Sequence, residues 1–161
     1  MSEVNEETTT AVGDSDERDE TVPEGAVCSV EESERMIEAW AKAMGLSSKL
    51  DESGLFPDEV SALRKAKRDL QDAILQGHLV LDAESRFVFT PYDVGADAKL
   101  GKLVFDEPDM AMLRKAKTYR NAVEAQTHLL QGMTRADTIK LGKMKNRNAA
   151  VCTAIVSLFL G

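Results

Sequence analysis

One stretch of the chain carries most of the information about its fold: LVFDEPDMAMLRKAKTYRNAVEAQTHLLQGMTRADTIKLGKMKNRNAAVCTAIVSLFL, residues 103–160. It begins with a short apolar segment and a Pro-containing stop, and then shows helical periodicity in three successive segments. Nine Lys and Arg side chains against two acids give residues 110–161 a net charge of +7. This stretch therefore predicts a basic, largely helical surface.

The first helix of this stretch is predicted to follow Asp106, a good N-cap residue, with residues 107–109 in its first turn. It is expected to continue to Gly132. The residues expected along its buried side are Met110, Leu113, Ala116, Val123 and Leu130.

Thr134 and Asp137 predict the start of a short second helix, which residues 146–148 (Asn-Arg-Asn) interrupt. A last helix is predicted over residues 149–160, with apolar side chains on more than one face. A helix that is apolar nearly all round is either central to a core or docks on another molecule.

Upstream of this stretch, the hydrophobic period changes from helical to alternating. Residues 78–82 and 86–90 alternate around the short segment 83–85, which predicts a β-hairpin. Leu79 and Leu81 are expected to share a face with two aromatic residues of the second strand, and residues 103–105 can add a third strand. A lone hairpin is marginally stable, so this one must pack on the helices or pair with another chain.

Two further helices are predicted nearer the N-terminus. Ser29 and Glu32 form a capping-box pattern before an apolar stripe that includes Trp40, the only tryptophan, which we interpret as a core residue. Pro57 suits the first turn of the next helix. Gly45 and Gly77 are expected to end the two helices.

The charge pattern divides the chain. Residues 1–27 contain nine acids and one base. Their net charge of −8 equals that of the whole chain, and they are predicted to be a disordered acidic tail. Residues 28–161 form one α-rich domain, comprising a helical pair (28–77), a hairpin and strand (78–105) and C-terminal helices (106–161). The predicted class is α+β, mainly α, with a small antiparallel sheet. The tail is either simply solvated or folds back on the basic helices.

The sequence predicts neither an enzyme nor a bound cofactor or metal. It contains no phosphate-binding loop, nucleophile elbow or His-Glu-x-x-His motif, and His78 and His128 have no ligand at metal-binding spacing. Cys28 and Cys152 form no redox pair and suit a reducing cytosol. We expect no secretion signal and no membrane span, and so a cytoplasmic protein.

Nucleic acid is an alternative partner because of the +7 stretch. Against it, the aromatic residues there are only Tyr119 and Phe159, which offer no stacking platform, and the bases are spread over three helices. The sequence therefore favours a protein partner.

Several segments resemble the small tail assembly chaperones of tailed bacteriophages, in a loose match over about residues 73–161. The resemblance rests on the hairpin region from residue 73, on Leu103-Val104-Phe105-Asp106-Glu107-Pro108, on residues 129–142 (LLQGMTRADTIKLG) and on the final Phe159-Leu160. Such proteins often carry an acidic residue between the last two helices, where this chain has Asn-Arg-Asn at 146–148. The acidic tail has no counterpart in the family.

The resemblance implies a chaperone that coats the tape-measure protein before the tail tube polymerises and that is absent from the finished virion. Family members are often also made in a frameshifted, longer form. The candidate partner-binding residues form a charged rim, Arg114 and Lys117, around an apolar centre. The residues of the apolar centre can alternatively be interpreted as core: Val151, Ile155, Leu158 and Phe159. The alternative functions are a structural virion protein of the tail or head–tail region and a small nucleic-acid-binding protein. Self-association stays open.

Overall fold

The structure, a computed structural model, describes residues 25–92 and 101–160 of the chain. Its elements in chain order are α2 (Val30–Ala43), the 3-10 helix η3 (Ser47–Leu50), α3 (Pro57–Leu75), β2 (Leu79–Leu81), β3 (Phe87–Phe89), β4 (Leu103–Val104), α4 (Met110–Ala116), α5 (Ala122–Thr134), α6 (Thr138–Gly142) and α7 (Asn146–Leu160). The predicted class is confirmed, because the chain is mainly helical with one small antiparallel sheet.

Helices α2 and α3 begin and end where the sequence predicts. The Ser29 hydroxyl accepts a hydrogen bond from the Glu32 N–H at 3.1 Å, and the Glu32 carboxylate accepts one from the Ser29 N–H at 3.0 Å. Pro57 is the first residue of α3. Gly45 and Gly77 follow the two helices with φ angles of +73° and +79°, a backbone conformation that glycine adopts without steric cost.

The sheet has the strand order β2-β3-β4 with antiparallel neighbours, which confirms the hairpin and the third strand. Leu79 pairs with Phe89 and Leu81 with Phe87, so these four side chains share one face as predicted. Leu103 pairs with Phe89 and is buried with it. The sheet thus closes one end of the hydrophobic core.

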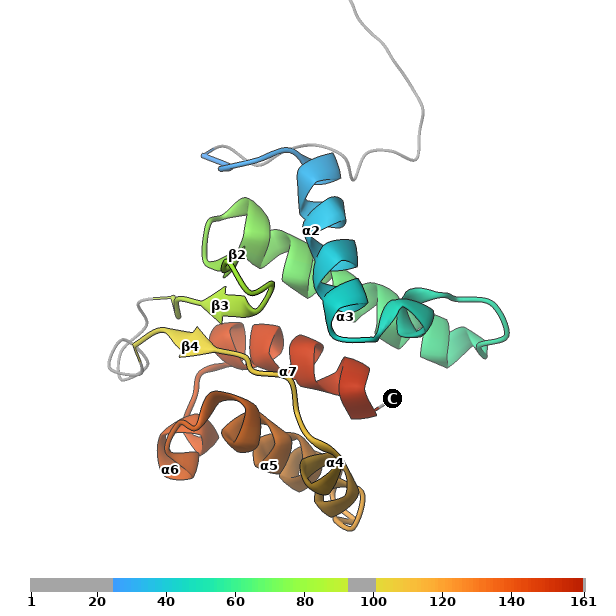
Figure 1. Cartoon of the computed structure of the whole chain (residues 1–161), viewed down its shortest axis with the longest axis vertical. Helices are drawn as coiled ribbons and strands as arrows, with labels where there is room; N and C mark the ends of the chain where they lie inside the picture. The colour runs from blue at the N-terminus through green and yellow to red at the C-terminus, as the bar shows by residue number, and fades with distance from the viewer. Residues whose placement is uncertain (1–24, 93–100, 161) are drawn as a thin grey trace, which may run out of the picture.

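Helix α7 lies at the centre of the fold. In Figure 1 it runs between α2 and α3 on one side and α4, α5 and α6 on the other. Because it has neighbours on both sides, its apolar residues are covered around most of its circumference; six of them are buried: Val151, Cys152, Ala154, Ile155, Val156 and Leu158.

The long helix predicted after Asp106 is wrong in two respects. Its N-cap is Asp109, whose carboxylate accepts a hydrogen bond from the Met112 N–H at 2.8 Å. The chain then breaks after α4 and starts again at α5, where the Asn121 side chain accepts from the Val123 N–H at 2.8 Å. Two residues expected in the core, Met110 and Val123, are 64% and 66% exposed. Met110 is the first residue of α4, and Val123 follows the break and therefore lies in a different helix from the one predicted.

The C-terminal boundaries also differ from the prediction. Asp137 caps α6 as expected, but Thr134 is the last residue of α5 and takes no part in that cap. Residues 146–148 form the first turn of α7 instead of interrupting a helix.

The start of the folded domain differs slightly as well. The predicted acidic tail lies outside the described residues up to position 24. From Gly25 the chain is described, and the Val27 N–H donates to the Leu75 carbonyl at 2.9 Å. The domain therefore begins before residue 28.

Candidate partner-binding surface

Seven exposed basic side chains occupy α4, α6 and the segments that flank α5. We call this set the basic layer: Arg114, Lys115, Lys117, Arg120, Arg135, Lys140 and Lys143. None of the seven forms an ion pair with any residue in the described ranges 25–92 and 101–160. Both charged residues predicted for partner binding, Arg114 and Lys117, belong to this set and are exposed.

Exposed apolar side chains lie on the same three helices. Met110 of α4, Val123 of α5 and Ile139 of α6 are 64%, 66% and 67% exposed. Helices α4 and α5 pack on α7, and α6 packs on α5, so the exposed residues of these helices face away from those contacts. Helices α4–α6 therefore present basic and apolar groups together, the combination found where charge steers a partner and buried apolar area holds it.

The apolar residues predicted for partner binding lie elsewhere. Val151, Ile155 and Leu158 are 4%, 0% and 6% exposed, and they belong to the hydrophobic core. Their predicted exposure is wrong because α7 has α3 on one side and α5 on the other, so both faces are already covered. The alternative interpretation as core residues is the one the structure supports.

Phe159 is half-buried and belongs to an aromatic cluster. Its ring meets Trp40 edge-on at 5.8 Å between centroids, while Phe87 packs against Trp40 at 4.7 Å. Trp40 is fully buried, as predicted for a core residue, and its Nε1–H has no hydrogen-bond acceptor among the described residues. Phe159 thus contributes to the core, and its outer edge is the only part that a partner can touch.

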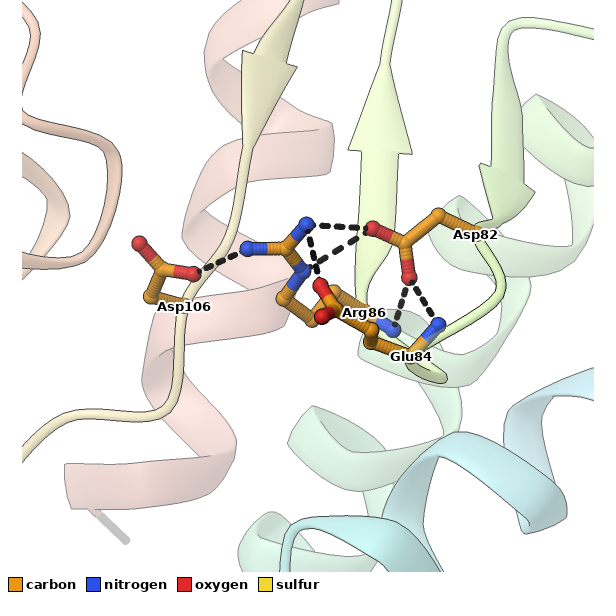
Figure 2. A network of polar contacts seen from close by, with 4 residues as sticks. All are labelled: Asp82, Glu84, Arg86 and Asp106. Atoms are coloured by element: carbon orange, nitrogen blue, oxygen red, sulfur yellow. Dashed lines mark hydrogen bonds and ion pairs between the residues drawn. The ribbon is translucent and has the colours of Figure 1, made fainter.

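An arginine connects the hairpin to the basic layer. Figure 2 shows the Arg86 guanidinium between Asp82 in the hairpin turn and Asp106 just after β4. Its Nη1 lies 2.7 Å from the Asp106 carboxylate, and its Nε lies 2.9 Å from that of Asp82. The Asp106 N–H in turn donates to the Met133 carbonyl of α5 at 3.1 Å. Arg86 therefore holds the strand that leads into the layer.

Hydrogen bonds around Arg86 shift the pKa values of the groups involved. Backbone N–H groups of Arg86 and Glu84, together with the Arg86 side chain, lower the pKa of Asp82. The carboxylates of Asp106 and Asp82 raise the pKa of Arg86. These contacts also explain why Asp106 does not cap α4: its side chain is already engaged by Arg86, a tertiary contact that the local sequence does not reveal.

A second polar cluster joins α7 to the end of the sheet. The Arg147 guanidinium carbon lies 3.8 Å from the centroid of the Tyr92 ring, and His78 stacks on Tyr92 at 3.9 Å. Burial raises the pKa of the Tyr92 hydroxyl, and the nearby charge of Arg147 partly opposes this effect. The buried Asn148 amide bonds to the Tyr92 backbone. These contacts join the first turn of α7 to the segment that follows the hairpin.

A half-open groove of about 770 Å³ lies between α2 and α3. Three bases and three acids contribute to its wall, so its charge is mixed: Arg64, Lys67, Arg68, Glu34, Glu38 and Asp72. None of the residues predicted for partner binding lines it. It is therefore separate from the basic layer.

Sequence reasoning missed two kinds of residue that shape this surface. Asn121 is one, although Asn followed by Glu124 three residues later is a helix-start pattern that was available inside the predicted long helix. Ile139 is the other, and it was missed because its exposure depends on how α6 packs against α5. The sequence carries no local signal for this packing.

No cluster of three or more His, Cys, Asp or Glu side chains with metal-binding geometry occurs in the part of the chain that the structure describes. Within residues 25–92 and 101–160, every helix is too short or too polar to cross a lipid bilayer. Comparison with protein-family models, with curated proteins and with solved structures finds no match to this chain.

Proposed function

We propose that this protein is a phage tail assembly chaperone that binds the tape-measure protein during tail morphogenesis in the cytoplasm of the host cell. The proposal starts from the sequence resemblance over about residues 73–161. It assigns the protein a binding role without catalysis. The long partner expected for such a chaperone needs an extended surface to lie on, not an enclosed pocket.

The observation that carries the proposal is the composition of the outer side of α4–α6. Seven exposed bases without ion-pair partners in the described ranges lie with Met110, Val123 and Ile139 on these helices. Such a surface is complementary to a helix with acidic and apolar side chains, and its charges favour rapid, reversible association. The proposed binding surface is therefore α4–α6, with Arg114 and Lys117 retained and the buried α7 residues left out.

Co-expression with a candidate tape-measure protein tests this function. The expected result is a soluble, co-purifying complex with the wild-type chain and a much reduced yield with the combined variant Arg114→Glu, Lys117→Glu and Ile139→Ser. The matched control reverses Lys42 and Lys49, which are exposed on the opposite half of the domain. If the tape-measure protein stays insoluble with the wild-type chain, the chaperone function is wrong.

The first alternative, a structural protein of the tail or head–tail region, makes a different prediction about the particle. A chaperone leaves before assembly is complete, whereas a structural protein stays. Mass spectrometry of purified virions separates the two, because peptides of this chain at stoichiometric abundance identify a structural protein.

Nucleic acid is the second alternative, and the unpaired bases of the basic layer are the observation in its favour. Binding through phosphates weakens steeply as salt rises, with the slope reporting the number of phosphates contacted. A gel-shift titration with nonspecific DNA at low and high salt tests it. Failure to shift at low salt removes this alternative.

A further inference from the structure

The sequence before Gly25 has a charge opposite to that of the basic layer. Residues 1–24 contain nine acids and one base, for a net charge of −8, and no aromatic residue. The basic layer has seven positive charges on α4–α6 and its flanking segments. Because Glu124 and Asp137 lie in the same region, residues 110–143 have a net charge of +5, which is opposite in sign to that of residues 1–24.

Three bases outside the basic layer have carboxylate partners, whereas others, such as Lys42 and Lys49, have no ion pair within the described ranges either. Arg64 pairs with Glu52 at 2.9 Å, Lys65 with Asp69 at 2.8 Å, and Arg86 with three carboxylates. Within the described ranges 25–92 and 101–160, the seven bases of the layer form no such pair. Like charges gathered on adjoining helices repel one another, so a polyanion that binds them relieves that repulsion.

We propose that the occupant of the basic layer in the free protein is the chain's own acidic segment, residues 1–24, bound in cis. An extended chain spans about 3.3 Å per residue, so 24 residues reach roughly 80 Å. A folded domain of this size has a radius of gyration of about 14 Å, so the segment can pass around it from Gly25 to the far side. Length does not prevent the contact.

Binding in cis has a large entropic advantage over binding in trans. A covalently linked segment sees its target at an effective concentration in the millimolar range, so even weak ion pairing populates the bound form. The interaction is electrostatic and becomes screened as the Debye length falls from about 10 Å at 0.1 M salt to about 3 Å at 1 M. An acidic partner that adds apolar contacts to Met110, Val123 and Ile139 displaces the segment.

The segment therefore masks the layer until such a partner arrives. This regulatory consequence rests on the proposed function, whereas the contact itself does not. The opposite charges of residues 1–24 and of the basic layer favour this acidic segment as the occupant over a neutral or basic one.

Carbodiimide cross-linking of the full chain tests the contact directly, because the reagent joins a carboxylate to a lysine only where the two already touch. We expect peptides that link residues 1–24 to Lys115, Lys117, Lys140 or Lys143, and we expect these links to disappear at 1 M NaCl. Lys42 of α2 and Lys49 of η3, which are exposed and lie outside α4–α6, are the internal controls. A one-to-one mixture of ¹⁵N-labelled and unlabelled protein identifies links within one chain.

Three results would overturn the proposal. They are the absence of links from residues 1–24 to the basic layer, equal linkage to the control lysines, and links of which about half join a labelled to an unlabelled chain, the share that random pairing between chains gives. None of them depends on the tape-measure protein, so this test can fail while the proposed function stands, and the reverse also holds.

A second experiment tests the masking by measuring the affinity of the chain for heparin, which serves as a polyanion probe. Replacing the nine acids of residues 1–24 by Asn or Gln is expected to tighten heparin binding by about tenfold at 50 mM NaCl, and to change it little at 500 mM. Neutralising exposed acids of α2 (Glu31, Glu34 and Glu38) controls for net charge. If heparin affinity rises equally per acid neutralised in the α2 variant and in the variant of residues 1–24, the segment does not mask the layer.

Discussion

Asn148 forms two hydrogen bonds with the backbone of Tyr92. The Tyr92 N–H donates to Asn148 Oδ1 at 2.7 Å, and Asn148 Nδ2 donates to the Tyr92 carbonyl at 3.2 Å. The Asn148 side chain is fully buried. An amide is required here because it both accepts and donates, whereas a carboxylate only accepts.

Asn148→Asp is expected to lower the free energy of unfolding by about 2–4 kcal/mol at pH 7, because it removes the donor to the Tyr92 carbonyl and buries a charge. Protonation restores a donor, so the pKa of the new carboxyl is raised in the folded state. Its penalty is therefore smallest below the unfolded pKa of about 4 and grows as pH rises. Urea unfolding at pH 3.5 and 7 measures both effects.

Asn146→Asp is the control for this change, since Asn146 is exposed in the same first turn of α7. A carboxylate at a helix N-terminus is favourable by about 0.3–1 kcal/mol. Equal destabilisation by the two substitutions would contradict the role given to Asn148.

Two isoleucines separate the core from the proposed binding surface. Ile155 of α7 is fully buried, and Ile155→Ala is expected to cost about 2–5 kcal/mol of stability. Ile139 of α6 is 67% exposed, and Ile139→Ala is expected to change stability by less than about 0.5 kcal/mol while weakening partner binding. Thermal unfolding and a binding assay on both variants check the pair, and a stability loss at Ile139 as large as that at Ile155 would refute the assignment.

Two aspartates are expected to affect stability with opposite signs. Hydrogen bonds from Arg86 and Glu84 lower the pKa of Asp82 in the fold, so its stabilisation is present above the unfolded pKa of about 4 and is lost as pH falls through the folded pKa. Burial and the neighbouring Asp69 raise the pKa of Asp72, so its stabilisation is present below about pH 4 and is lost as pH rises.

At pH 7, Asp82→Asn should therefore destabilise the fold and Asp72→Asn should stabilise it. Both differences from the wild-type chain should shrink toward pH 3. Chemical unfolding at several pH values provides the measurement. Two shifts of the same sign at pH 7 would show that one of the pKa directions is wrong.

The link from the hairpin to the basic layer is tested by Arg86→Gln, which removes the ionic contacts to Asp82 and Asp106. We expect faster amide hydrogen exchange at Asp106, whose N–H bonds to Met133, and little change in α2. Arg64→Gln breaks the comparable pair with Glu52 on the other half of the domain and should leave Asp106 unaffected. Unchanged exchange at Asp106 in the Arg86 variant would mean that the ion pairs do not hold this strand.

Local signals in the sequence were sufficient for the N-terminal helices and for the hairpin. Ser29 and Glu32 lie three residues apart and cap each other, and the alternation around Phe87 and Phe89 fixes which face is buried. Such features depend on residues close together in the chain. They can be predicted without knowledge of the fold.

Features that depend on distant residues were predicted less well. Asp106 satisfies the pattern of a helix cap, but Arg86 engages it from across the sheet and Asp109 takes its place. Asn148 looks like a helix breaker until its partner Tyr92, 56 residues away, is known. The α7 residues drop out of the proposed binding surface for the same reason, because apolar composition does not reveal which helix is covered on both sides.

The central position of α7 has a consequence for the order of events during synthesis. Helices α3 and α5 both pack on it, and its residues 146–160 follow theirs in the chain. While the ribosome is still making α4–α6, α7 does not yet cover the apolar sides of the earlier helices. Such exposed apolar surface makes the nascent chain prone to aggregation. The packing of α7 joins segments that lie far apart in the chain, and the Arg147–Gln76 contact spans 71 positions. Because contacts between distant residues form slowly, this packing is a late and comparatively slow step of folding. A pause in translation at any point between the synthesis of α3 and that of α7 would prolong this vulnerable interval.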